Sequence, residues 1–171
     1  MQRLLYTIGY EGSTIEEVLA TLAAAEIDCV LDVREVPISR KAGFSKSALS
    51  SRLEARGIAY MHFKGLGDPK PGRIAAREGR HDDFRQIFNA HLMTATAQAD
   101  LARALDVAKS RATCLLCFER NPTHCHRLIL ANEIAQRERI GLANLETQSR
   151  IASISSKRYL RTHDRTDAHF G

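Results

Sequence analysis

The chain has 171 residues, of which 44% are hydrophobic and 26% charged, with a formal net charge of +5. This length is typical of one ordinary domain, and the composition excludes a disordered chain and a membrane-embedded one. The basic balance favours an anionic partner, such as a phosphate-bearing substrate or nucleic acid, without identifying one.

The apolar run at residues 4–8 is too short for the core of a secretory signal, and Gly9 and Glu11 interrupt it. No other stretch approaches the ~20 apolar residues that span a bilayer. We therefore expect a cytoplasmic protein without a membrane partner, in which the four cysteines remain thiols.

The first third of the chain has a strand, helix, strand pattern. Residues 4–8 are rich in β-formers, and the sequence from Ser13 to Glu16 has the form of a capping box before a helix over 14–25. The apolar run at residues 28–33 predicts a second strand. Such a unit favours parallel pairing with a right-handed crossover.

The middle of the chain alternates loops with regular elements. We expect a loop over 34–44, a helix over 45–55 ended by Gly57, and a strand over 58–63. Residues 64–82 contain several glycines and prolines among charged residues, and are predicted to form a long loop.

The last predicted elements lead to the richest motif of the sequence. Two helices, over 83–93 and 97–110, precede a wholly apolar strand over 113–118. Asn121 and Pro122 are typical of a helix start, and this helix is expected to run to about Arg139, followed by a strand over 142–146.

The alternating pattern predicts a three-layer α/β fold, with an open, mainly parallel sheet of about five strands and helices on both faces. Residues 1–147 form this single domain, and residues 148–171 are interpreted as a polar, basic tail. Ligands of such sheets bind outside the carboxyl ends of the strands, which directs attention to the loops that follow them.

The loop after the fourth predicted strand suggests an anion site. A helix that begins near Asn121 would present free backbone N–H groups to the ligand edge, and Arg120 and Arg127 would add positive charge. The alternative is that Asn121 only begins a helix and that both arginines are solvated.

The cysteines and histidines do not have the spacing of a metal motif. Cys114 and Cys117 point to opposite faces of a strand, and His124 and His126 would face nearly opposite ways on a helix. A site built from Cys117, Cys125 and one histidine is geometrically possible but lacks paired spacing. We assign no metal ligands from the sequence, and the cofactor remains unknown.

Several other side chains near the strand ends are candidates for chemistry. Cys125, at a helix start, could be a nucleophile with a lowered pKa, or simply a core residue. Glu11, Asp32 and Glu119 could act as general acid and base, although Asp32 could equally pair with a nearby arginine. Tyr10 could stack on a base or close the edge of the core.

Several motifs resemble one family. Their order along the chain is similar to that in the domain-of-unknown-function family four-eight-eight, and the resemblance covers roughly residues 4–146. The motifs are Tyr6–Gly12, Leu31–Arg34 with Pro37, Ser39 and Arg40, Gly43–Lys46, Leu66–Gly67, Leu116–Arg120 and Cys125–Arg127.

The resemblance implies a small α/β domain with a polar cleft, but no settled reaction, and some members carry a DNA-repair label. The sequence from Asp68 to Pro71 departs from the family pattern, in which a further glycine and proline follow Gly67.

The first hypothesis for function is an enzyme, such as a hydrolase, that acts on a nucleotide or nucleic acid. Its catalytic residues would be Glu11, Asp32, Glu119 and Cys125. Its binding residues would be Tyr10, Arg34, Ser39, Arg40, Cys117, Arg120, His126 and Arg127.

Two alternatives remain open. One is a cysteine- or metal-dependent enzyme centred on Cys117, Cys125 and His126. The other is a non-catalytic nucleic-acid-binding module that uses the basic tail and the loop over 64–82.

Overall fold

The structure is a computed structural model that describes residues 3–148, so the predicted tail from residue 149 on lies outside the described residues. Five strands form one sheet in which every pairing is parallel, in the order β3-β2-β4-β1-β5. The strands are β1 (Leu4–Gly9), β2 (Cys29–Asp32), β3 (Ala59–His62), β4 (Thr113–Cys117) and β5 (Gly141–Leu145).

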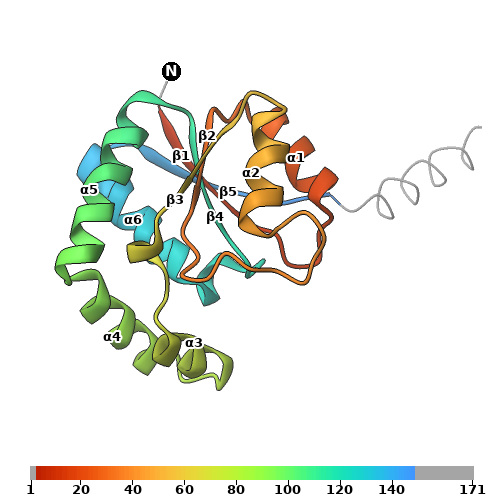
Figure 1. The fold of residues 1–171 in the computed structure, drawn as a ribbon. Helices are drawn as coiled ribbons and strands as arrows, with labels where there is room; N and C mark the ends of the chain where they lie inside the picture. Colours follow the sequence, from red (N-terminus) through yellow and green to blue (C-terminus); the bar gives the residue numbers. More distant parts are fainter. Residues whose placement is uncertain (1–2, 149–171) are drawn as a thin grey trace, which may run out of the picture.

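Helices cover both faces of the sheet, as Figure 1 shows, so the predicted three-layer α/β fold is confirmed. The α-helices are α1 (Ile15–Ala24), α2 (Lys46–Glu54), α3 (Lys70–Arg77), α4 (His81–Leu92), α5 (Ala95–Ser110) and α6 (His126–Glu138). Two short 3-10 helices are η1 (Lys64–Leu66) and η2 (Pro122–His124). No helix among residues 3–148 is both long and apolar enough to cross a bilayer.

Two hydrophobic clusters separate the faces. Helices α1 and α2 pack their apolar sides on one face, against Val30, Cys114 and Leu116. Helices α4, α5 and α6 pack on the other face, where Leu31 and Cys117 point. Because side chains alternate along a strand, Cys114 and Cys117 lie on opposite faces, as expected.

The start of α1 differs by one residue from the expectation. Thr14, not Ser13, is the N-cap, and its side chain accepts from the backbone N–H of Glu17, whose carboxylate accepts in return from the N–H of Thr14. Ser13 is instead buried and hydrogen-bonds Thr147. Both residues are good caps, and tertiary packing of Ser13 decides between them.

The prediction of a long loop over 64–82 is wrong. This segment contains η1 and α3, and α4 begins at His81. Pro71 stands in the first turn of α3, where a missing N–H costs nothing, and Gly72 is buried against Asp68. The prolines and glycines that suggested a loop therefore begin and pack a helix.

The start of α6 is also displaced. Asn121 caps only the 3-10 turn η2, and the α-helix begins at His126 with Cys125 as its N-cap. Cys125 has extended backbone angles, φ −131° and ψ 140°, so it is not in the first turn of a helix. This difference controls the geometry of the candidate site.

Candidate functional site

The candidate site lies at the carboxyl end of β4, at the centre of the sheet. The chain leaving β1 passes to α1 on one face, while the chain leaving β4 passes to α6 on the other. Neighbouring strands whose connections diverge in this way leave a crevice at their carboxyl ends, which is the usual ligand position in open α/β sheets.

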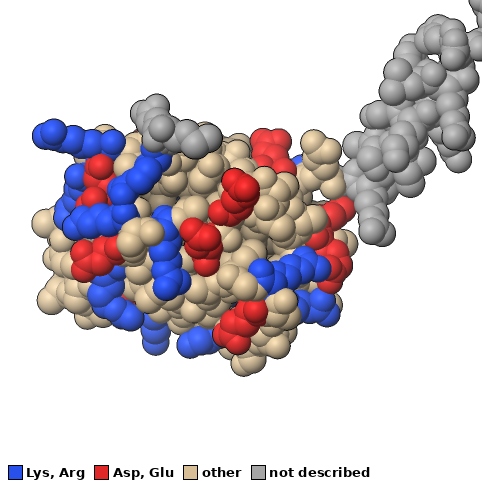
Figure 2. Space-filling model, turned by 90° about the horizontal axis from the view of Figure 1, so that it is seen from above, with Lys and Arg blue, Asp and Glu red and all other residues tan. Residues whose placement is uncertain are grey.

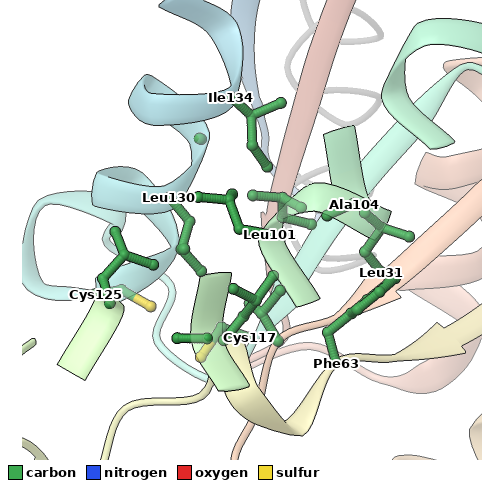
Figure 3. Packing of buried hydrophobic residues seen from close by; sticks show 14 of the residues in the cluster. Leu31, Phe63, Leu101, Ala104, Cys117, Cys125, Leu130 and Ile134 are labelled. Atoms are coloured by element: carbon green, nitrogen blue, oxygen red, sulfur yellow. The ribbon is translucent and has the colours of Figure 1, made fainter. Parts of the chain in front are cut away.

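Cys117, Cys125 and His126 converge in this region. Their ligand atoms all lie within 4.8 Å of one another, and all three residues are buried. The Nδ1 atom of His126 is 3.9 Å from the sulfur of Cys117 and 3.8 Å from that of Cys125. Figure 3 places both cysteine sulfurs at the same end of the hydrophobic cluster under α4 to α6.

The backbone of Cys125 explains why two adjacent residues can face one point. Consecutive side chains inside an α-helix diverge by about 100°. Because Cys125 is extended and His126 is the first helical residue, that limit does not apply to the pair. The sequence predicted no metal ligands because Cys117, Cys125 and His126 lack the paired spacing of a zinc motif.

The ring of His126 is oriented by its other nitrogen. Nε2 lies 2.8 Å from the carbonyl oxygen of Val33, to which it can donate. Burial lowers the pKa of His126, but Cys125 and the carbonyl of Val33 raise it to about 9, so binding of a metal through Nδ1 would require that nitrogen to lose its proton. This arrangement, in which one imidazole nitrogen is fixed by a carbonyl, is typical of histidines that bind metal through the other nitrogen.

Glu119 lies beside the three residues. The thiol of Cys117 donates to Oε2 of Glu119 over 3.2 Å. Burial alone would raise the pKa of Glu119, but its own backbone N–H and the thiols of Cys117 and Cys125 donate to the carboxylate and hold the pKa below its usual value. Burial in turn raises the pKa of Cys125 well above that of a free thiol. Glu119 is therefore the charged acceptor of this group.

Asp68 is a further acidic group at the site, and it is not among the candidates predicted from the sequence. The residue is 6% exposed, and Oδ1 is buried without a hydrogen-bond partner among residues 3–148. Burial raises the pKa of Asp68 to about 6, although the positive charges of His126 and Arg73 act to lower it. Its position one residue after Gly67, in a loop already singled out, was the only signal in the sequence.

The arginines of the predicted phosphate site make internal contacts instead. Arg127 is 1% exposed and donates to Thr7 Oγ1 and to the backbone carbonyls of Glu119 and Arg120. Arg34 forms a buried ion pair with Asp32 at 2.6 Å. Both guanidinium groups hold loops of the protein in place.

Asp32 and Tyr10 belong to a second buried polar group, under α1 and α2. Asp32 accepts from Arg34 and from the hydroxyl of Tyr60, and Arg34 also donates to Tyr10 Oη and to the carbonyl of Phe44. The ring of Tyr10 stacks on that of Phe44 at 4.1 Å. These contacts agree with the structural alternatives, an ion pair for Asp32 and a core-edge position for Tyr10.

The remaining candidates lie at the rim of the same edge. Glu11 is exposed and accepts from the backbone N–H of Arg120, whose side chain donates to the carbonyl of Thr147. Ser39 accepts from the N–H of Lys41 within a turn, and Arg40 is exposed. None of these contacts brings the four residues Glu11, Ser39, Arg40 and Arg120 into the cysteine and histidine group.

Basic side chains also gather away from the site. Figure 2 looks at the opposite end of the molecule and shows Lys and Arg densest on one side, interspersed with acidic residues. Ion pairs among the described residues include those of Lys109 with Asp106 and Glu138, and of Arg137 with Glu133.

Comparison with known proteins gives one match. The family model described as domain of unknown function DUF488 matches residues 14–134, a range that includes both cysteines, His126, Glu119 and Asp68. No curated protein and no solved structure matches the chain.

Proposed function

This chain belongs to the family described as domain of unknown function DUF488, and we propose that it is a metal-dependent hydrolase. The observation that carries the proposal is the convergence of Cys117, Cys125 and His126, whose ligand atoms lie within 4.8 Å of one another. Rotations of the three side chains by small amounts would bring these atoms to bonding distance of one ion.

Zinc is the ion that fits this set of donors. Two thiolates and one imidazole are soft to borderline ligands, which favour zinc over magnesium or calcium. Three protein ligands with a fourth position free for water are the pattern of catalytic zinc sites, whereas structural sites use four protein ligands. The carbonyl of Val33 supports the same role by fixing the His126 ring.

Glu119 supplies the general base of the proposal. Its carboxylate lies 3.2 Å from the sulfur of Cys117, so Glu119 would be a neighbour of an ion held by that sulfur. Zinc deaminases combine a His/Cys/Cys ligand set with a glutamate that is not a ligand but moves protons. Here Glu119 would take a proton from water as the water oxygen bonds to the substrate, and would return that proton to the leaving group.

This proposal is favoured over a phosphate site built from arginines. Arg34 and Arg127 are 6% and 1% exposed, and their guanidinium groups donate to acceptors within the protein. Removing them from those partners would leave buried carbonyls and a buried carboxylate unpaired, at a cost of about 1–3 kcal/mol for each group.

Cobalt substitution tests the proposed centre. The full chain should bind one Co²⁺, with the intense visible absorption of a tetrahedral ion and the near-ultraviolet band of thiolate coordination. Added cyanide should then change the visible bands, because one position is open to solvent ligands. Glu119→Gln should keep the cobalt spectrum, since Glu119 is not a ligand in this account.

Two results would oppose the proposal. Absence of a thiolate band at saturating Co²⁺ would exclude the ligand set. A tetrahedral spectrum that cyanide leaves unchanged would indicate a closed, structural site and exclude hydrolysis at the ion.

A further inference from the structure

The carboxylate of Asp68 makes no hydrogen bond among residues 3–148. It is 6% exposed, and Oδ1 is fully buried without a partner. Buried polar atoms nearly always have partners, and an exception in a native fold needs an explanation. Burial also raises the pKa of Asp68 to about 6, because a buried carboxylate without a partner is less stable in its charged form.

The chain holds Asp68 in this position although a partner is near. Arg73 donates to the backbone carbonyl of Asp68 at 2.6 Å and to the carboxylate of Glu35, so it does not pair with the Asp68 side chain. A Cβ on Gly72 would lie 2.1 Å from Asp68 Oδ1, so the absence of a side chain at residue 72 leaves room for the carboxyl group.

The charges around the site select the kind of ligand. Asp68 and Glu119 interact electrostatically with each other and with His126. The guanidinium groups of Arg34, Arg73 and Arg127 each have acceptors within the protein. In the zinc-loaded site two thiolates would offset the charge of the ion, so the carboxylates of Asp68 and Glu119 would leave the site negative, which repels a phosphate and attracts N–H donors.

We propose that Asp68 is a substrate-binding residue that accepts hydrogen bonds from an N–H group, so that the substrates are amides, amidines or amino-heterocycles and not phosphates. The inference rests on the proposed hydrolase for its chemistry. An N–H group of an amide, amidine or amino-heterocycle can donate a charge-assisted hydrogen bond to a carboxylate, which would give the carboxylate of Asp68 the partner that it lacks among the described residues. Substrate binding is then the reason for leaving this group without a partner in the free protein.

Benzamidine and inorganic phosphate serve as probes of the zinc-loaded full chain. Benzamidine binding, followed by ligand-observed NMR titration, should be saturable in the wild type and weakened roughly 10-fold or more in Asp68→Asn, since a charge-assisted bond is lost. Phosphate, followed by its ³¹P line width, should show no saturable binding.

Asp82→Asn is the matched control. It removes the same charge from the start of α4, where Asp82 is 86% exposed in its side chain, and should leave benzamidine affinity unchanged. Equal affinity in wild type and Asp68→Asn, no benzamidine binding to the wild type, or saturable phosphate binding would each overturn the inference.

Metal content measured in every sample separates this inference from the proposed hydrolase. If the chain binds no zinc but Asp68 still determines benzamidine binding, the hydrolase proposal fails and the binding role stands. If zinc binds and Asp68→Asn has no effect on benzamidine, only the inference fails.

Discussion

Arg127 and Asp68, two buried charged residues at the carboxyl edge of the sheet, have opposite environments. Arg127 has three acceptors for its guanidinium group, whereas the Asp68 carboxylate has no hydrogen bond among the described residues. A paired buried charge stabilises the loops that it bridges, while an unpaired one reduces stability and is tolerated where function requires it.

Asp68→Asn should therefore stabilise the protein at neutral pH. The folded chain holds the Asp68 proton up to a pKa of about 6, while the unfolded chain loses it near 3.8. Stability contributed by the protonated form is present below pH 4 and is lost as the pH rises to about 6. Allowing for solvent screening, the variant should gain about 1 kcal/mol at pH 7 and nothing at pH 3.5, as measured by urea unfolding. A gain of equal size at both pH values would contradict the assignment.

Arg127→Ala should act through stability. Loss of the guanidinium leaves the carbonyls of Glu119 and Arg120 and the hydroxyl of Thr7 without their donor. We expect a loss of about 3 kcal/mol in the free energy of unfolding. Arg137→Ala, which breaks an exposed ion pair with Glu133, should cost about 0.5 kcal/mol. Similar losses of unfolding free energy in the two variants would show that the hydrogen bonds of Arg127 do not stabilise the fold more than an exposed ion pair does.

At the scale of elements, most strands and helices follow from their apolar patterns. The five strands lie within one or two residues of the predicted ranges, because buried parallel strands read as continuous apolar runs. The errors occur where one residue type has two uses. Pro71 begins α3 and was interpreted as a loop residue, and Asn121 caps a single 3-10 turn and not a helix.

The displaced helix start had the largest effect on the candidate site. Adjacent cysteine and histidine residues converge only because Cys125 is extended, and no periodicity reveals an extended N-cap. The unpaired state of Asp68 was likewise invisible, since it depends on where Arg73 points. Sequence patterns identify the loops at the ligand edge, but contacts decide which side chains in them are free.

The close approach of β1 to the loop after β4 gives a prediction at this scale. A Cβ on Gly9 would lie 1.8 Å from the carbonyl oxygen of Glu119, so Gly9→Ala must displace the loop that carries Glu119. We expect a cost of about 2 kcal/mol and weaker binding of metal.

Gly57→Ala is the comparison for this prediction. Gly57 has a φ of +73° with no atom within 4 Å of an added Cβ, so its cost of about 1 kcal/mol should leave metal affinity intact. Unchanged metal affinity in Gly9→Ala would show that the loop position does not matter to the centre.

At the scale of the whole molecule, the topology explains why the site lies where it does. The central strand β4 sends its connection to one face while its neighbours β1 and β2 send theirs to the other. The helical unit of α3 and α4 lies below this edge in Figure 1 and carries Gly72 and Arg73 to Asp68. Segments far apart in sequence thus supply the two acids, the cysteines and the histidine.

Zinc affinity in two cysteine variants of the same strand tests the metal centre most directly. Cys117 and Cys114 are three residues apart on β4, are both buried, and face opposite sides of the sheet. The wild type and Cys114→Ala should each bind one zinc ion per chain, measured by competition with a chromophoric chelator. Cys117→Ala should lose affinity by about 100-fold or more. Equal zinc affinity in Cys114→Ala and Cys117→Ala, or no zinc binding by the wild type, would contradict the account.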